Sequence, residues 1–204
     1  LTEGIELLHV HYAIPHAYAA YMAKKILLEK GKYLPVVTTL HGTDITLVGK
    51  HPSYKPAVTF SINKSDVVTS VSESLKKDTL SSFVIKSEID VIPNFIDIDL
   101  YNIEDQCDRS QIAPNNEKIV IHISNMRPVK RIPDVIEIFH RIAQKEDAIL
   151  LMLGDGPERE RAEQQVRDLG IAEKVRFLGK TTEVRRLLCM SDLFLLTSQN
   201  ESFG

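Results

Sequence analysis

Three cations lie close together in the segment "SNMRPVKR", between an apolar run and an amphipathic stretch: Arg127, Lys130 and Arg131. The apolar run predicts a strand, and the amphipathic stretch predicts a helix that starts near Pro133. Cationic side chains beside the free N–H groups of a helix start bind phosphate or diphosphate. The segment therefore predicts a local anion site, with a solvated basic turn as the alternative.

The segment "NESFG" follows another apolar run and presents the carboxylate of Glu201 beside Ser202. A carboxylate accepts hydrogen bonds from vicinal hydroxyls such as those of a sugar. A helix cap is the alternative interpretation. In "LGDGPERE", Gly154 and Gly156 predict a tight turn from a strand to a helix. This spacing is not GxGxxG, which argues against dinucleotide binding.

Histidines gather in the first part of the chain, where His9 and His11 alternate on a predicted strand and so point to one face. His16 and His41 lie nearby along the predicted sheet edge. Hydrogen-bonded edge histidines are the preferred interpretation. A metal-dependent hydrolase is the open alternative, and its zinc ligands would be His9, His11, His41 and Asp44.

Short apolar runs alternate with helical patterns along the chain. The predicted strands are Ile5–Val10, Val36–Leu40, Val67–Val71, Val91–Ile92, Ile119–Ser124, Ile149–Leu153, Val175–Leu178 and Leu193–Thr197. The predicted helices are Ala17–Lys30, Glu73–Ser82, Pro133–Gln144, Pro157–Leu169 and Glu183–Met190. Such alternation needs crossovers, so the fold class is α/β with doubly wound parallel sheets. Ligands of such sheets bind beyond the carboxyl ends of the strands, and we expect a cleft between two units there.

The alternation breaks once, in a polar and acidic stretch without a clear period. We interpret residues 95–116 as an interdomain linker between a domain at 1–94 and a domain at 117–204. Each domain has about four predicted strands, where a doubly wound domain usually has about five or six. Both are therefore expected to be incomplete, the first lacking its front part and the second its back part.

The composition is that of a soluble globular protein, with 204 residues, 43% hydrophobic and 26% charged. A formal net charge of −3 gives no global field that favours nucleic acid or an anionic membrane. No apolar run approaches the roughly 20 residues that span a bilayer. Cys107 and Cys189 have no metal spacing and form no disulfide framework, which predicts a reducing compartment. We therefore expect a cytoplasmic protein.

Four segments, "SNMRPVKR", "LGDGPERE", "VRFLGK" and "SDLFLLTSQNESFG", resemble family 4 retaining glycosyltransferases in order and spacing. The family has a GT-B fold, in which two Rossmann-like domains face each other across a cleft. Glu201 matches the first glutamate of the family's E-x7-E motif; the second, which holds the nucleotide ribose, would follow Gly204. The family's Gly-rich loop is also absent. The resemblance therefore implies a fragment that lacks both ends and is inactive alone.

The resemblance also implies roles for single residues. Lys130 matches the lysine that grips the donor diphosphate, and Arg127 lies two residues from the usual place of its partner arginine, near Asn125. His41 matches a histidine beside the anomeric carbon. The implied catalytic residues are His41, Lys130, Arg127 and Glu201. The implied donor-binding residues are Asn125, Arg127, Lys130, Gly154, Glu201, Ser202, Phe203 and Gly204.

The first half resembles more narrowly those family members that begin bacillithiol biosynthesis, in "HVHYAIPHAYAAYMAKK", "TTLHGTDITLVG", "FSINKSDVVTSVSESL" and "IPNFID". That resemblance implies transfer of N-acetylglucosamine from UDP-GlcNAc to L-malate, with no metal and no other cofactor. Tyr12, Thr43 and Asn94 are the implied acceptor-binding residues. The implied partners are the nucleotide sugar and a small-molecule acceptor, not nucleic acid or membrane, and a homo-oligomer is left open.

Three alternatives stay open at this point. The nearest is a family 4 transferase with another sugar or a lipid as acceptor, in cell-envelope polysaccharide synthesis. The second is a nucleotide-sugar binding module without catalysis, and the third is the metal-dependent hydrolase.

Overall fold

The computed structural model of the chain describes residues 4–47, 49, 51–99 and 107–201. The described residues up to Phe95 form one compact unit, and those from Ile96 onward form another. We call them the first unit and the second unit. The division into domains at 1–94 and 117–204 with a linker at 95–116 stays a prediction.

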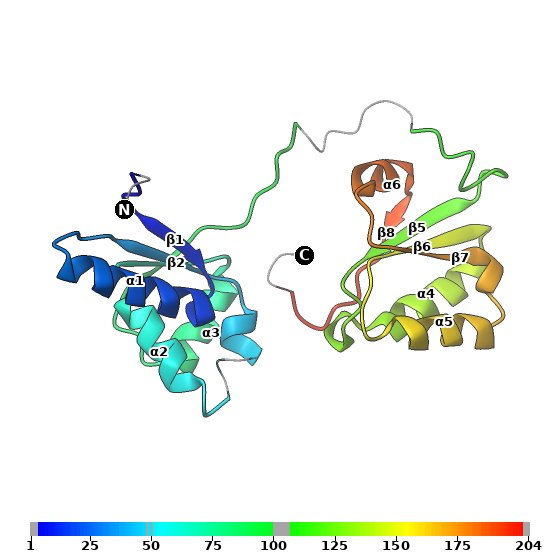
Figure 1. Cartoon of the computed structure of the whole chain (residues 1–204). Helices are drawn as coiled ribbons and strands as arrows, with labels where there is room; N and C mark the ends of the chain where they lie inside the picture. Colours follow the sequence, from blue (N-terminus) through cyan, green and yellow to red (C-terminus); the bar gives the residue numbers. More distant parts are fainter. Residues whose placement is uncertain (1–3, 48, 50, 100–106, 202–204) are drawn as a thin grey trace. The chain divides into compact units, whose positions relative to one another are not determined.

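The first unit contains a four-stranded parallel sheet in the order β1-β2-β3-β4 (Figure 1). Its strands are β1 (Leu8–His11), β2 (Val36–Leu40), β3 (Val67–Ser70) and β4 (Ile89–Val91). Its helices are α1 (Tyr18–Glu29), α2 (Lys55–Lys64) and α3 (Glu73–Ser82), with short turns at Ala13–Ala17 and Thr43–Leu47. Because the strands follow one another in chain order, right-handed crossovers place these helices on one face of the sheet. The core there includes Leu40, Val58 and Ile62.

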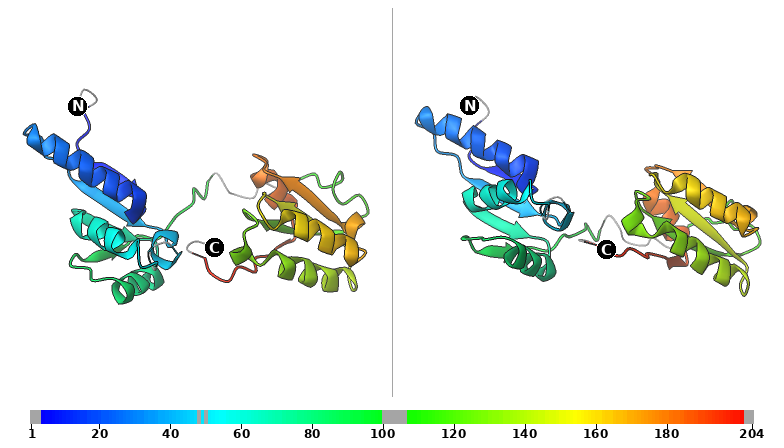
Figure 2. Two further views of the ribbon diagram at one scale, coloured as in Figure 1. Left: turned by 60° about the horizontal axis from the view of Figure 1, so that its bottom comes forward. Right: turned by 90° about the horizontal axis from the view of Figure 1, so that it is seen from below.

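The second unit contains a four-stranded parallel sheet in the order β7-β6-β5-β8. Its strands are β5 (Lys118–Ile123), β6 (Ala148–Leu153), β7 (Val175–Gly179) and β8 (Leu193–Phe194). Its helices are α4 (Ile132–Ala143), α5 (Arg159–Asp168) and α6 (Val184–Met190). In the view from below (Figure 2), α4 and α5 lie side by side on one face, where they share a core that includes Ile136, Phe139 and Val166. On the other face, Leu187 and Met190 of α6 pack into a separate core.

The predicted α/β class with parallel sheets is confirmed. Two predicted elements, Val36–Leu40 and Glu73–Ser82, have the observed bounds. The first and last strands were predicted too long, because β1 pairs with β2 only from Leu8 and β8 pairs with β5 only through Leu193 and Phe194. The helix α2 was missed altogether.

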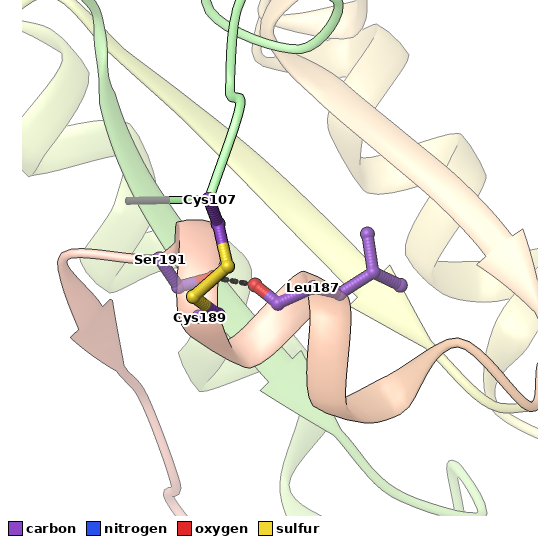
Figure 3. Close-up of a disulfide and its surroundings, with 4 residues drawn as sticks. All are labelled: Cys107, Leu187, Cys189 and Ser191. Atoms are coloured by element: carbon purple, nitrogen blue, oxygen red, sulfur yellow. Dashed lines mark hydrogen bonds between the residues drawn. A yellow bond between two sulfur atoms is a disulfide. The ribbon is translucent and has the colours of Figure 1, made fainter. Parts of the chain in front are cut away.

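Cys107 and Cys189 form a disulfide (Figure 3), with their Cα atoms 5.9 Å apart. The prediction of no disulfide was wrong, because the folded chain brings together two cysteines that are 82 residues apart in sequence. Cys189 lies on α6, whose end is closed by the Ser191 hydroxyl donating to the Leu187 carbonyl at 2.7 Å. The disulfide therefore ties the segment that precedes β5 to α6.

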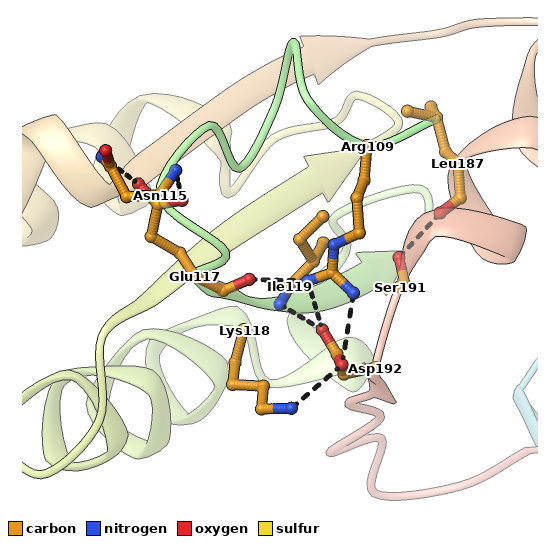
Figure 4. Close-up of polar contacts among 8 residues, drawn as sticks. All are labelled: Arg109, Asn115, Glu117, Lys118, Ile119, Leu187, Ser191 and Asp192. Carbon is orange, nitrogen blue, oxygen red and sulfur yellow. Dashed lines mark hydrogen bonds and ion pairs between the residues drawn. The ribbon is translucent and has the colours of Figure 1, made fainter. Parts of the chain in front are cut away.

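Hydrogen bonds from Arg109 also hold the segment that precedes β5 (Figure 4). Its guanidinium donates to the Glu117 carbonyl at 2.6 Å and to the Asp192 carboxylate at 2.8 Å. Asp192 also accepts the N–H of Ile119 at 2.7 Å, at the start of β5. The hydrogen bond from Arg109 lowers the pKa of Asp192, and burial opposes it only in part. This network lies at the amino end of β5, away from the strand ends where ligands bind in such sheets.

Candidate functional site

The strand order of the second unit reverses between β5 and β8 (Figure 1). From β5 the chain continues outward through β6 and β7, and it then returns to the other side of β5 as β8. In open parallel sheets a ligand crevice forms at such a switch point, beyond the carboxyl ends of the two strands. Residues 124–131 follow β5 and residues 195–201 follow β8. These are two of the loops that the sequence singled out.

Lys130 and Glu201 form an ion pair at this switch point. Their side chains are only 19% and 24% exposed, so water screens the pair less than it would at the surface. Burial alone would raise the pKa of Glu201, but the hydrogen bond and the charge of Lys130 outweigh it and lower this pKa. The sequence singled out both residues separately, and the structure brings them together.

Two further hydrogen bonds join the two loops. The Thr197 hydroxyl donates to the Lys130 carbonyl at 2.9 Å, and the Gln199 N–H donates to the Val129 carbonyl at 2.9 Å. The loops after β5 and β8 therefore form one connected surface, in which Lys130 and Glu201 have fixed neighbours.

His122 is a buried residue of this site that the sequence analysis missed. It is the second-last residue of β5 and has no exposed surface. Its ring nitrogens lie 2.8 Å from the Leu195 carbonyl oxygen and 2.8 Å from the Ser124 hydroxyl. The signal in the sequence was a histidine inside the apolar run "KIVIHI". Such a side chain must have hydrogen-bond partners in the core.

The other two cations of "SNMRPVKR" have different surroundings. Arg131 adopts a positive φ of 52° and forms an ion pair with Asp134, in the first turn of α4. Arg127 is exposed and precedes the short turn that ends at Lys130, and Asn125 is exposed two residues before it. Lys130 is thus the partly buried member of the predicted anion site.

Gly154 and Gly156 allow the loop after β6 to approach the loop after β5 closely. A Cβ atom at Gly154, where φ is 103°, would lie 1.8 Å from the Ser124 carbonyl oxygen. One at Gly156 would lie 1.9 Å from the Asn125 carbonyl oxygen. Any side chain at either position would push these two loops apart. A shallow pocket of about 300 Å³ opens beside them, lined by Asp155, Gly156 and Lys180.

His41 follows β2 in the first unit and is hydrogen bonded to His11, with 2.8 Å between His41 Nε2 and His11 Nδ1. Burial lowers the pKa of His41, and the neighbouring His11 lowers it further. His41 is therefore a neutral imidazole near pH 7. The ring of Tyr12 lies beside it, with the two centroids 5.0 Å apart.

Asp44 holds the backbone around these side chains. Its carboxylate is 2% exposed and accepts the N–H groups of Ala13 at 2.8 Å and Gly42 at 3.1 Å. Burial raises its pKa, although these backbone hydrogen bonds oppose the shift. Asp44 thus holds two turns together. One follows β1 and begins after Tyr12, and the other follows β2.

The remaining predicted residues occupy loops or lie outside the described residues. Thr43 is exposed in the turn after β2, and Asn94 is half-buried in the loop after β4. Ser202, Phe203 and Gly204 lie outside the described residues.

The geometry gives no support to the hydrolase alternative. Across residues 4–47, 49, 51–99 and 107–201, no group of three or more His, Cys, Asp or Glu side chains is placed to hold a metal ion. His9 bonds to the Thr39 hydroxyl at 2.8 Å, and Asp44 is engaged with backbone N–H groups. Among the same described residues, no helix is long and apolar enough to cross a membrane.

Comparison with known families defines the class of protein. Residues 1–100 match the family described as "Glycosyltransferase Family 4", and residues 104–204 match "Glycosyl transferases group 1". The chain belongs to these glycosyltransferases, as the sequence resemblance predicted. The HepE protein of Anabaena, crystallised with UDP and glucose, has the same fold with a TM-score of 0.83. It is 22% identical, over 98% of this chain and 55% of that one, and the fold is of the GT-B type.

Particular relatives are more similar in sequence. The chain is 48% identical over 204 residues to N-acetyl-alpha-D-glucosaminyl L-malate synthase of Bacillus anthracis, which covers 99% of this chain and 53% of the relative. It is 31% identical over 146 residues to poly(ribitol-phosphate) alpha-N-acetylglucosaminyltransferase of Staphylococcus aureus (strain COL), covering 70% of this chain and 27% of that relative. The chain thus spans about half the length of the first relative and 27% of the length of the second.

Proposed function

We propose that the full-length protein is a retaining glycosyltransferase that moves N-acetylglucosamine from UDP-GlcNAc to L-malate, the first step of bacillithiol biosynthesis. The observation that carries the proposal is the 48% identity over 99% of the chain to the Bacillus anthracis protein named for malate. The donor sugar has a second support, because the Staphylococcus aureus relative is also named as an N-acetylglucosaminyltransferase.

In this proposal the second unit binds the donor. Lys130 at the switch point contacts the diphosphate, with Arg127 as a second cation, and Glu201 accepts hydrogen bonds from sugar hydroxyls. The remaining donor contacts are assigned to Asn125, Gly154, Ser202, Phe203 and Gly204. The partial burial of the Lys130–Glu201 pair supports this assignment, since charges in a less hydrated site interact more strongly with a phosphate.

The reaction exchanges one bond at the anomeric carbon. The bond from this carbon to the diphosphate oxygen breaks, and UDP leaves with the electron pair. The malate hydroxyl forms the new bond on the same face of the sugar, and its proton passes to the departing phosphate. Lys130 and Arg127 stabilise the negative charge that develops on that phosphate. No protein base is needed for this proton.

The first unit is proposed to bind the acceptor through Tyr12, Thr43 and Asn94. His41 orients the donor at the anomeric carbon, and its lowered pKa keeps it neutral for this task. A neutral imidazole both donates and accepts a hydrogen bond, as hydroxyl groups require. We further propose that the transfer needs no metal ion.

We also propose a cytoplasmic location, the compartment in which sugar nucleotides are made. Disulfides such as Cys107–Cys189 are rare in that compartment. Fractionation of cells that make the full-length protein should recover it together with cytoplasmic marker proteins. Recovery with membrane or secreted proteins would argue for another compartment.

The test of the function uses full-length protein, UDP-GlcNAc and a panel of hydroxy acids, with products identified by mass spectrometry. We expect equimolar UDP and N-acetylglucosaminyl malate, and the same yield with a metal chelator. Transfer only to a sugar or lipid would favour a family 4 enzyme of cell-envelope synthesis. Binding of UDP without turnover on any acceptor would indicate a binding module instead.

A further inference from the structure

The buried ring of His122 links the two loops of the donor site from behind. One nitrogen, Nδ1, lies 2.8 Å from the carbonyl oxygen of Leu195, where the chain leaves β8. The other, Nε2, lies 2.8 Å from the hydroxyl of Ser124, where the chain leaves β5. The ring is fully buried, so water cannot replace either partner.

The partners define which nitrogen carries the proton. A carbonyl oxygen can only accept a hydrogen bond, so Nδ1 must be the donor toward Leu195. In a neutral ring Nε2 then accepts from the Ser124 hydroxyl, whose oxygen in turn accepts the N–H of Met126 at 3.1 Å. Each of these three hydrogen bonds has one donor and one acceptor, and the series connects Met126 to Leu195.

A neutral ring fits the surroundings of His122. Burial has the largest effect and lowers its pKa. The hydrogen bond to the Leu195 carbonyl opposes this, the charge of Lys130 lowers the pKa further, and Glu201 has the smallest effect and raises it. The ring therefore keeps one acceptor and one donor nitrogen near pH 7.

Both ends of this series of hydrogen bonds lie a few residues before the ion pair in the sequence. Met126 is buried, has a positive φ of 42° and lies four residues before Lys130 in the loop after β5. Leu195 lies six residues before Glu201 in the segment after β8. The ring thus sits where the two strands end, between the first residues of their loops.

We propose that His122 is a positioning residue of the donor site. As a neutral imidazole with its proton on Nδ1, it sets the spacing between the loop that carries Lys130 and the segment that carries Glu201. The inference rests on the proposed function, because it takes this ion pair as the place where the nucleotide diphosphate binds. His122 itself touches neither substrate.

Substitutions can test the two hydrogen bonds of the ring separately, the one at Nδ1 and the one at Nε2. His122→Asn can keep a donor near the Nδ1 position, His122→Gln can keep a polar group near Nε2, and His122→Phe keeps the ring shape with neither bond. A residue with only a structural role would change the melting temperature and leave ligand affinity alone. A positioning residue changes the affinity for UDP and the KM for the donor, and leaves the KM for the acceptor unchanged.

The experiment measures UDP affinity by calorimetry, both KM values and the melting temperature in full-length protein. The control is Val166→Ala, which removes core volume from α5 in the same unit and leaves His122, Ser124 and Leu195 unchanged. For His122→Phe we expect a roughly tenfold loss of UDP affinity and an equal rise in the donor KM. His122→Asn and His122→Gln should fall between this variant and the wild type. Val166→Ala should match the drop in melting temperature and keep UDP affinity.

The outcomes separate the inference from the function on which it rests. A wild-type protein that does not bind UDP overturns the proposed function and the inference with it. Wild-type binding together with unchanged UDP affinity in folded His122→Phe overturns the inference alone. If His122→Phe does not fold, Ser124→Ala leaves the ring in place and removes the hydrogen bond at Nε2. Weaker UDP binding by Ser124→Ala then supports the inference, and unchanged binding by it and by His122→Asn overturns it.

Discussion

The two units have parallel sheets of the same size, but they arrange the polar groups at their strand ends differently. Among the described strands, the first unit runs in one direction from β1 to β4, whereas the second reverses between β5 and β8. At the carboxyl ends of strands in the first unit, hydrogen bonds hold the polar groups, such as His11 to His41 and backbone N–H groups to Asp44. In the second unit an ion pair of Lys130 and Glu201 stands at the reversal.

We propose that this difference reflects a division of labour between donor and acceptor binding. A diphosphate needs a cation that is held in place, and the reversal of the sheet brings two loops together to hold it. A hydroxyl group both donates and accepts a hydrogen bond, and a neutral imidazole can be its partner in either role.

Replacement of Lys130 should have the largest effect. Lys130→Ala removes the cation that is proposed to stabilise the leaving diphosphate, and we expect kcat/KM to fall by about 10²- to 10³-fold. Steady-state rates with varied UDP-GlcNAc measure this, and the KM for malate should stay the same. The matched control is Lys145→Ala, which removes an exposed lysine of the same unit. A Lys130→Ala enzyme that keeps the wild-type rate would refute the donor assignment.

Replacement of His41 should lower kcat and leave the affinity for UDP nearly unchanged. His41→Ala removes the neutral imidazole paired with His11, and we expect kcat to fall by about 10- to 100-fold through lost orientation. UDP affinity, measured by calorimetry, should stay within about twofold because the proposed diphosphate contacts are in the second unit. His51→Ala, in an exposed loop of the first unit, is the control. A large loss of UDP affinity in His41→Ala would contradict the division between the units.

The sequence was sufficient for the residues whose chemistry depends on local pattern. Val36–Leu40 and Glu73–Ser82 were predicted with the observed bounds, because apolar runs and a serine cap mark their ends. Lys130 and Glu201 were each singled out as charged residues after a predicted strand. What the sequence did not reveal is that they form a pair, since this depends on β8 lying next to β5.

The missed features depend on contacts between distant segments. The helix α2 was missed because its buried residues are few, with Val58 and Ile62 on a mostly polar helix. The Cys107–Cys189 disulfide joins cysteines 82 residues apart, and no local spacing predicts it. The proposed role of His122 depends on its contact with Leu195, which follows a strand far along the chain.

Asp44 of the first unit should show a stability effect of intermediate size. Asp44→Asn replaces one acceptor oxygen by an NH₂ group that faces the N–H of Ala13 or Gly42, so we expect a loss of about 1–3 kcal/mol. Since the folded-state pKa of Asp44 lies above 3.8, the wild type gains stability over the variant as pH falls through that pKa toward 3.8. Native-state hydrogen exchange at the two amides measures both effects. The control, Asp90→Asn on the exposed side of β4, should change neither amide.

Asp192 of the second unit should show the smallest effect and the opposite pH dependence. Asp192→Asn weakens the contacts to Arg109 and Lys118, which are partly exposed, so we expect a loss of about 1 kcal/mol near pH 7. Because the folded-state pKa of Asp192 lies below 3.8, the wild type loses this advantage as pH falls below 3.8 through that pKa. Hydrogen exchange at the Ile119 amide, which donates to Asp192, follows the loss directly. Asp147→Asn is the control, since that side chain is 70% exposed in its pair with Lys174. If the Asp44 and Asp192 variants responded to acid in the same direction, the contrast between a carboxylate held by neutral groups and one held by cations would not stand.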